Sequence, residues 1–239
     1  MRKIYSILGL LLLMAAQLHA QPGKHVWNKP NYDQYPFHFG FALGYNQMNF
    51  RIIPKAEMLS NFDSVYAVEN TPRPGFNIHM VGSLRLGNYF DLRFIPGLAF
   101  GQRDLTYNHR VVDGVDTTIE RHVMAIESTM LSFPLYFKYR AKRLNNWRPY
   151  LLFGGNYTID LEARKKIKEE EQPKIRLERQ DFYLEAGIGV DYYFPFFKLA
   201  TELRFSWGIM DMINIENTEY ALFYDKLNSR MFTLLIFVE

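Results

Sequence analysis

Large apolar residues alternate with small or polar residues along most of the chain, with a period of two. Residues 37–46 show this most clearly. Every second residue from Phe37 to Tyr45 is aromatic or Leu, and the residues between them are His, Gly or Ala. Successive side chains of a β-strand point to opposite faces, so this period indicates strands with one apolar and one polar face.

Eight segments follow this pattern: residues 37–46, 76–86, 90–107, 129–140, 149–161, 182–194, 197–209 and 230–239. The connections between them alternate in length. They are short at 87–88, 141–147 and 195–196, and long at 51–75, 108–128, 162–181 and 210–229. An even strand number with short periplasmic turns and long outer loops is the rule for bacterial outer-membrane barrels. The pattern therefore predicts an all-β fold, an eight-stranded antiparallel transmembrane β-barrel over residues 37–239, with both termini in the periplasm.

The apolar face is expected to contact lipid. It carries Phe39, Phe41, Leu92, Phe94, Phe133, Leu135, Leu203 and Phe205. A soluble barrel of the lipocalin type would place such residues inside, but four or five large side chains per strand would overfill an eight-stranded barrel. Aromatic residues make up 16% of the chain, which also favours a membrane interface. The segment 230–239 is apolar on both faces, so its inward face stays unassigned.

The first 20 residues are typical of a signal peptide. Arg2 and Lys3 precede a short apolar run over residues 4–16, and Ala20 provides a small residue for cleavage before Gln21. The alternative is an uncleaved anchor, but this run is short for a hydrocarbon core of roughly 30 Å. Residues 21–36 are polar and contain three Pro, so we expect an extended periplasmic segment outside the barrel. The chain has no Cys, which excludes disulfides and lipoprotein acylation.

The polar face collects charged residues that must pair or be hydrated inside a narrow lumen. The predicted structural polar network consists of Arg85, Asp91, Arg93, Arg103, Lys138, Glu185, Asp191, Glu202 and Arg204. We interpret it as a plug of mutually neutralising groups. The functional alternative is a proton path or a site for an anionic ligand.

Motifs for catalysis or cofactor binding are missing from the sequence. Glu185 and Asp191 would lie roughly 20 Å apart on one strand and so cannot flank one bond. His38 and His79 both point inward and could meet, but two histidines are a poor metal site. There is no nucleotide-binding or nucleophile-elbow motif, and the net charge of +3 gives no reason to expect nucleic acid. We therefore predict no catalytic residues, cofactor, metal or small-molecule substrate, and keep a lipid-modifying barrel enzyme as a minor alternative.

Several stretches resemble the PorT family. They are Asn28-Lys29-Pro30-Asn31-Tyr32-Asp33, residues 38–41, 44–46, 74–77, 84–86, 91–98, 100–103 and 131–135, and the ending Ile236-Phe237-Val238-Glu239. This family consists of small barrels of the OmpA/OmpX type that serve type IX secretion and gliding motility in Bacteroidetes.

The resemblance implies a non-enzymatic accessory, assembly or anchoring role in protein secretion. The implied partners are outer-membrane lipid, lipopolysaccharide and other secretion-system proteins. The alternative is a generic small outer-membrane barrel that binds surface partners or lipopolysaccharide without a secretion role. Lys165, Lys166 and Lys168, in a loop of mixed charge, could touch lipopolysaccharide phosphates or be only a solvated loop.

Overall fold

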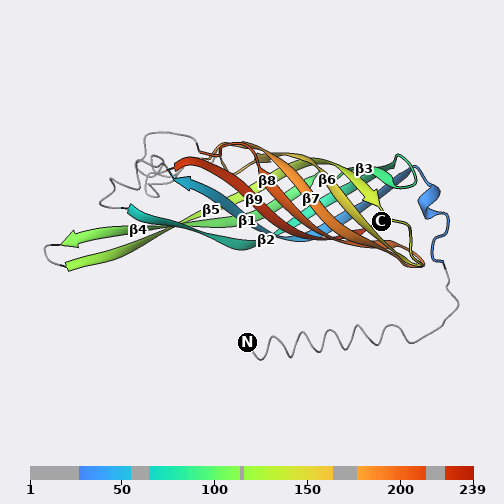
Figure 1. The fold of residues 1–239 in the computed structure, drawn as a ribbon, viewed down its shortest axis with the longest axis horizontal. Helices are drawn as coiled ribbons and strands as arrows, with labels where there is room; N and C mark the ends of the chain where they lie inside the picture. The colour runs from blue at the N-terminus through green and yellow to red at the C-terminus, as the bar shows by residue number, and fades with distance from the viewer. Residues whose placement is uncertain (1–26, 55–64, 114–115, 164–176, 214–223) are drawn as a thin grey trace, which may run out of the picture.

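A computed structural model of the chain describes residues 27–54, 65–113, 116–163, 177–213 and 224–239 (Figure 1). The predicted signal peptide, the start of the predicted periplasmic segment and the lysines of the mixed-charge loop lie outside the described residues. Within the described part of the chain, no helix is long and apolar enough to cross a membrane.

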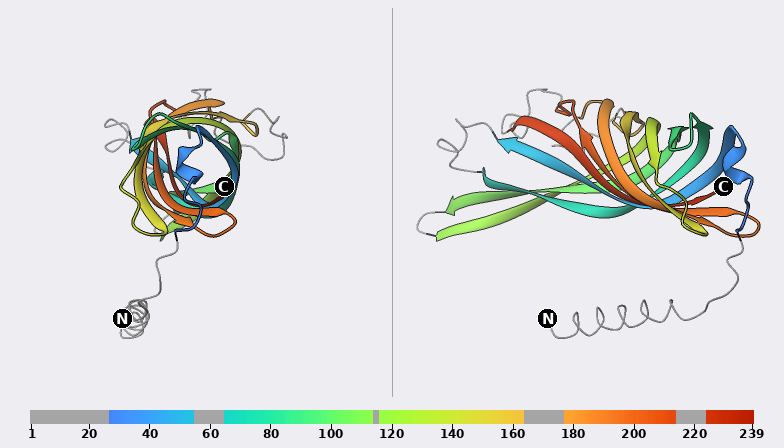
Figure 2. Two further views of the ribbon diagram at one scale, coloured as in Figure 1. Left: turned by 90° about the vertical axis from the view of Figure 1, so that its right-hand side faces the viewer. Right: turned by 45° about the vertical axis from the view of Figure 1, so that its right-hand side comes forward.

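The described residues form an all-β barrel of antiparallel strands. In chain order these are β1 (Phe37–Pro54), β2 (Val65–Arg85), β3 (Phe90–Phe94), β4 (Gly97–Asp113), β5 (Asp116–Arg140), β6 (Trp147–Asp160), β7 (Gln180–Tyr193), β8 (Lys198–Gly208) and β9 (Tyr224–Val238). β1 pairs with β2 on one side and with β9 on the other, which closes the sheet into a ring (Figure 2). The predicted fold class is confirmed.

β3 and β4 occupy one position in the ring. The sequence pattern predicts a single strand over residues 90–107, and the structure interrupts it at Ile95 and Pro96. Proline has no N–H to donate to a neighbouring strand, so the ladder breaks there. The register with β2 is nevertheless the same on both sides, with Gly82 opposite Phe94 and His79 opposite Gly97. The nine strand segments of the described chain therefore fill eight positions around the barrel.

One end of the barrel is longer than the sequence predicts. Residues 108–128 were expected to form a loop, but β4 and β5 stay paired from Gly97 and Ser132 out to Asp113 and Asp116. This hairpin extends past the rest of the barrel (Figure 1). Within that end lies a separate apolar cluster of Phe50, Leu105, Tyr107, Met124, Leu177, Met212, Ile213 and Leu227. Burial of this cluster stabilises the extension. We call this the hairpin end, and the opposite end, with the connections 86–89, 141–146 and 194–197, the turn end.

The faces of the strands follow the predicted alternation. Phe39 is 76% exposed, and most of the other residues predicted to face lipid are also exposed, whereas Leu92 is partly buried. The inward residues between them are buried. The structure also assigns the last strand, because Met231, Thr233, Leu235 and Phe237 all point inward and are buried. An outward face of large apolar groups around the ring is the surface that lipid requires of a barrel.

Candidate functional site

Buried charges fill the lumen, and Glu202 on β8 lies at their centre. Its carboxylate accepts hydrogen bonds from Arg93 at 3.3 Å, from Arg204 Nε at 3.0 Å and from the Tyr150 hydroxyl at 2.9 Å. All four side chains are buried. Arg93 also reaches Glu239 at 2.9 Å, so each of its two terminal nitrogens meets a carboxylate. Two arginines and two glutamates from β3, β8 and the residue after β9 thereby neutralise one another.

Glu185 and Asp191, both on β7, have separate partners. Arg204 donates to the Tyr136 hydroxyl at 2.7 Å, and that hydroxyl in turn donates to Glu185. Asp191 forms a salt bridge with Lys138, whose Nζ lies 2.8 Å from both carboxylate oxygens. The two carboxylates therefore act as acceptors in different parts of the same lumen.

Four of the nine predicted network residues form one bonded group: Arg93, Glu185, Glu202 and Arg204. Lys138 and Asp191 pair beside this group, with Lys138 Nζ over the Tyr150 ring. The other three lie toward the two ends of the barrel. Asp91 lies at the turn end, where it pairs with Arg140 at 2.9 Å. Arg103 lies toward the hairpin end, stacked over Phe50 at 4.0 Å, and donates to Ser128 at 2.6 Å. Arg85 lies on the inward face of β2, directly opposite Asp91, but at the rim of the barrel, where it is half-buried and donates to Gly87 and Asn88 of the turn.

The two inward histidines do not meet. β1 and β2 pair His38 with Ser83 and His79 with Ala42, so the histidines are four residues out of register. His38 instead stacks on Tyr32, with ring centroids 4.2 Å apart. Among the described residues, no three His, Asp or Glu side chains are grouped so that they could hold a metal ion.

Residues 27–36 of the N-terminal segment cap the turn end, so the expectation that the segment lies outside the barrel is wrong for these residues. Tyr32–Gln34 form a short 3₁₀ turn at the mouth of the barrel (Figure 2). The Asn28 side chain donates to the Tyr193 carbonyl at 2.9 Å, and the Tyr32 hydroxyl donates to Glu239 at 3.3 Å. Burial raises the pKa of the Tyr32 hydroxyl, which keeps this donor protonated.

Asp33 anchors this cap. Its carboxylate lies 3.1 Å from Arg148, 3.5 Å from Arg140 and 3.9 Å from Arg143. All three arginines are buried, and they come from the end of β5, the following turn and the start of β6. The sequence pattern missed this contact because the carboxylate and the arginines lie more than a hundred residues apart. Glu239 was also missed, because the inward face of the last strand was unassigned.

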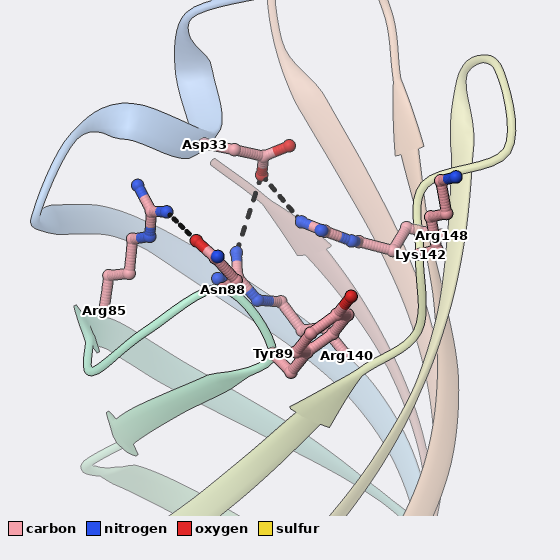
Figure 3. A pocket seen from close by; sticks show the side chains of 7 residues that line it. All are labelled: Asp33, Arg85, Asn88, Tyr89, Arg140, Lys142 and Arg148. Atoms are coloured by element: carbon pink, nitrogen blue, oxygen red, sulfur yellow. Dashed lines mark hydrogen bonds and ion pairs between the residues drawn. The ribbon is translucent and has the colours of Figure 1, made fainter.

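A pocket of about 290 Å³ opens beside the cap (Figure 3). It is lined by Asp33, Arg85, Asn88, Tyr89, Arg140, Lys142 and Arg148. The walls come from the 3₁₀ turn, the turn between β2 and β3, and the turn between β5 and β6. The pocket is thus built from the cap and from two of the turns at the turn end, with the strand residues beside them.

Comparisons with solved structures return small outer-membrane proteins. OprG from Pseudomonas aeruginosa is 11% identical, with a TM-score of 0.44, and the match covers 84% of this chain and 96% of that one. Neisserial surface protein A is 12% identical, with a TM-score of 0.40 and coverage of 85% and 99%. Ail from Yersinia pestis, solved with the heparin analogue sucrose octasulfate, is 13% identical, with a TM-score of 0.37 and coverage of 85% and 99%.

The family assignment rests on sequence. No curated protein matches the chain significantly. The profile of the family described as "Outer membrane protein beta-barrel domain" matches residues 16–214, which is most of the chain. This match agrees with the closed antiparallel ring and its apolar outer face. The chain belongs to the outer membrane protein beta-barrel domain family.

Proposed function

We propose that this protein is a non-enzymatic accessory component of a type IX secretion machine, with an assembly or anchoring role. One observation carries the proposal: residues from three separate PorT-like stretches converge at the turn end. Asp33 and Asp91 both pair with Arg140, at 3.5 Å and 2.9 Å. Arg93 and Tyr32 both donate hydrogen bonds to the Glu239 carboxylate. Stretches that lie far apart in the sequence are thus connected to one another at the turn end and in the lumen just beneath it.

The filled lumen supports an accessory role rather than a conduit. Arg93, Glu202 and Arg204 are buried and bonded to one another, and the cap covers their end of the barrel. A chain in transit would have to separate these buried ion pairs, at a cost of several kcal/mol for each uncompensated ion. The same pairing supports a non-enzymatic role, because these carboxylates are held as acceptors by fixed cations.

The proposal also includes an orientation of the barrel in the membrane, with the turn end on the periplasmic side. A signal peptide cleaved before Gln21 would export the chain, and the short connections of outer-membrane barrels face the periplasm. The cap and the pocket would then face the periplasm, where other secretion-system proteins can reach them.

The test is deletion of the gene, followed by comparison of the proteins in the culture medium with those of the complemented strain. We expect loss of the proteins secreted by the type IX route. A second strain, lacking residues 24–35 but keeping the signal peptide, should retain a heat-modifiable barrel and also lose secretion. Normal secretion from the complete deletion would contradict the secretion role, and normal secretion from the truncated strain alone would contradict a role for the cap.

The second candidate is a generic small barrel that binds surface partners or lipopolysaccharide. The feature that favours it is the hairpin of β4 and β5, which extends past the rest of the barrel at the opposite end. A strain that secretes normally without the gene but loses attachment to a surface partner would support this candidate instead.

A further inference from the structure

The turn-end pocket carries an excess of positive charge. Arg85, Arg140, Lys142 and Arg148 line it. The carboxylates that reach these four cations in the described structure are Asp33, which pairs with Arg140 and Arg148, and Asp91, which pairs with Arg140. Two positive charges therefore remain in excess. The lumen below contrasts with this, because its arginines and glutamates neutralise one another.

The two more accessible cations of the pocket, Arg85 and Lys142, pair with no carboxylate among the described residues. Arg85 donates to the adjacent turn, through the Gly87 carbonyl and the Asn88 side chain. Arg140 Nε and Arg148 Nη1, in contrast, already lie 2.9 Å and 3.1 Å from the carboxylates of Asp91 and Asp33. An anionic group that entered the pocket would therefore gain charge-assisted contacts with Arg85 and Lys142.

The chain itself shows which group fits. Asp33 is a carboxylate on a peptide segment, and three arginines hold it at 3.1–3.9 Å. Guanidinium groups bind carboxylates well because their donors form a planar fork. The lining contains one aromatic and no aliphatic side chain, so an acyl chain would find little apolar wall. The volume, about 290 Å³, suits one or two acidic side chains.

We infer that this pocket is a carboxylate site that binds an acidic peptide segment of a periplasmic partner, next to or in place of Asp33. The inference rests on the proposed function only for the periplasmic orientation of the turn end. Arg85 and Lys142 would provide the first contacts, since they are the more accessible cations and neither pairs with Asp33. Arg140 and Arg148 would add their positive charge from the buried wall of the pocket.

Binding of fluorescein-labelled hexaglutamate to the purified full chain in an uncharged detergent tests this inference, with fluorescence anisotropy as the readout. The double variant Arg85→Gln, Lys142→Gln should weaken binding about tenfold or more, because two charge-assisted contacts are lost. The matched control is Arg51→Gln, Arg230→Gln, which removes the same charge from exposed side chains toward the hairpin end. It should bind like the original chain. Asp33→Asn should bind more tightly, because a competing carboxylate is removed.

The outcomes separate this inference from the secretion role. Equal weakening by both double variants would show non-specific attraction and overturn the inference, as would no change with Arg85→Gln, Lys142→Gln. Displacement of the peptide by inorganic phosphate at concentrations where acetate has no effect would identify a phosphate site instead. Heat-modifiable mobility on a gel checks that each variant is folded. Normal peptide binding together with normal secretion in the deletion strain would overturn only the proposed function.

Discussion

Replacing Glu202 with Leu is expected to destabilise the folded barrel by about 3–5 kcal/mol. The substitution removes the carboxylate between Arg93 and Arg204 and leaves both guanidinium groups buried with fewer partners. It also removes the acceptor of the Tyr150 hydroxyl. Urea unfolding in lipid vesicles, followed by tryptophan fluorescence, measures the change in the free energy of unfolding.

The control is Glu178→Leu, which removes the same group from an exposed position at the hairpin end. A surface carboxylate contributes little, so we expect a change within about 1 kcal/mol. If Glu202→Leu were as stable as the original chain, the lumen charges would not depend on one another. The interpretation of the lumen as a mutually neutralising plug would then be wrong.

Replacing Ile188 with Arg is expected to cost roughly 2–4 kcal/mol in the same assay, because it places a charge on the lipid face near mid-depth. Ile188 is 56% exposed and lies in the middle of β7, with Leu151 and Leu203 beside it on the neighbouring strands. No described neighbour on this face offers a carboxylate to pair with the new charge.

Phe196→Arg provides the matched control. Phe196 is also apolar and is 90% exposed, but it lies in the connection between β7 and β8. A charge at the membrane boundary costs only about 0–1 kcal/mol. Equal costs at the two positions would show that depth in a bilayer does not matter, and would contradict a lipid-facing β7.

The strands and their faces could be predicted because the period-two alternation is a local property of the sequence. It places Glu185 and Asp191 inward and Ile188 outward without reference to the rest of the chain. It did not show the interruption at Pro96, because the large and small residues keep their alternation across the break. It also failed for β9, where Leu235 and Phe237 are apolar yet point inward.

The contacts that shape the two ends depend on distant parts of the chain. The cap depends on Asp33 meeting arginines more than a hundred residues away, and no spacing within residues 21–36 predicts that pairing. The extended hairpin depends on an apolar cluster to which β1, β4, β5 and β9 contribute Phe50, Leu105, Met124 and Leu227. The polar residues of the hairpin, taken without this cluster, have a composition typical of a loop. The pairing partners of the lumen charges could not be predicted, because they depend on the strand order and register of the folded barrel.

Spin labelling of the outer face of β7 tests the central claim, that the apolar outer face contacts lipid, most directly. The chain has no Cys, so Ile188→Cys and Phe196→Cys can each be labelled at a single site. In lipid vesicles, the label at 188 should collide often with dissolved oxygen, which concentrates in the bilayer, and rarely with a water-soluble nickel chelate. The label at 196 should be more accessible to nickel. Frequent nickel collisions at 188, equal to those at 196, would mean that water covers this face and would contradict a membrane-spanning barrel.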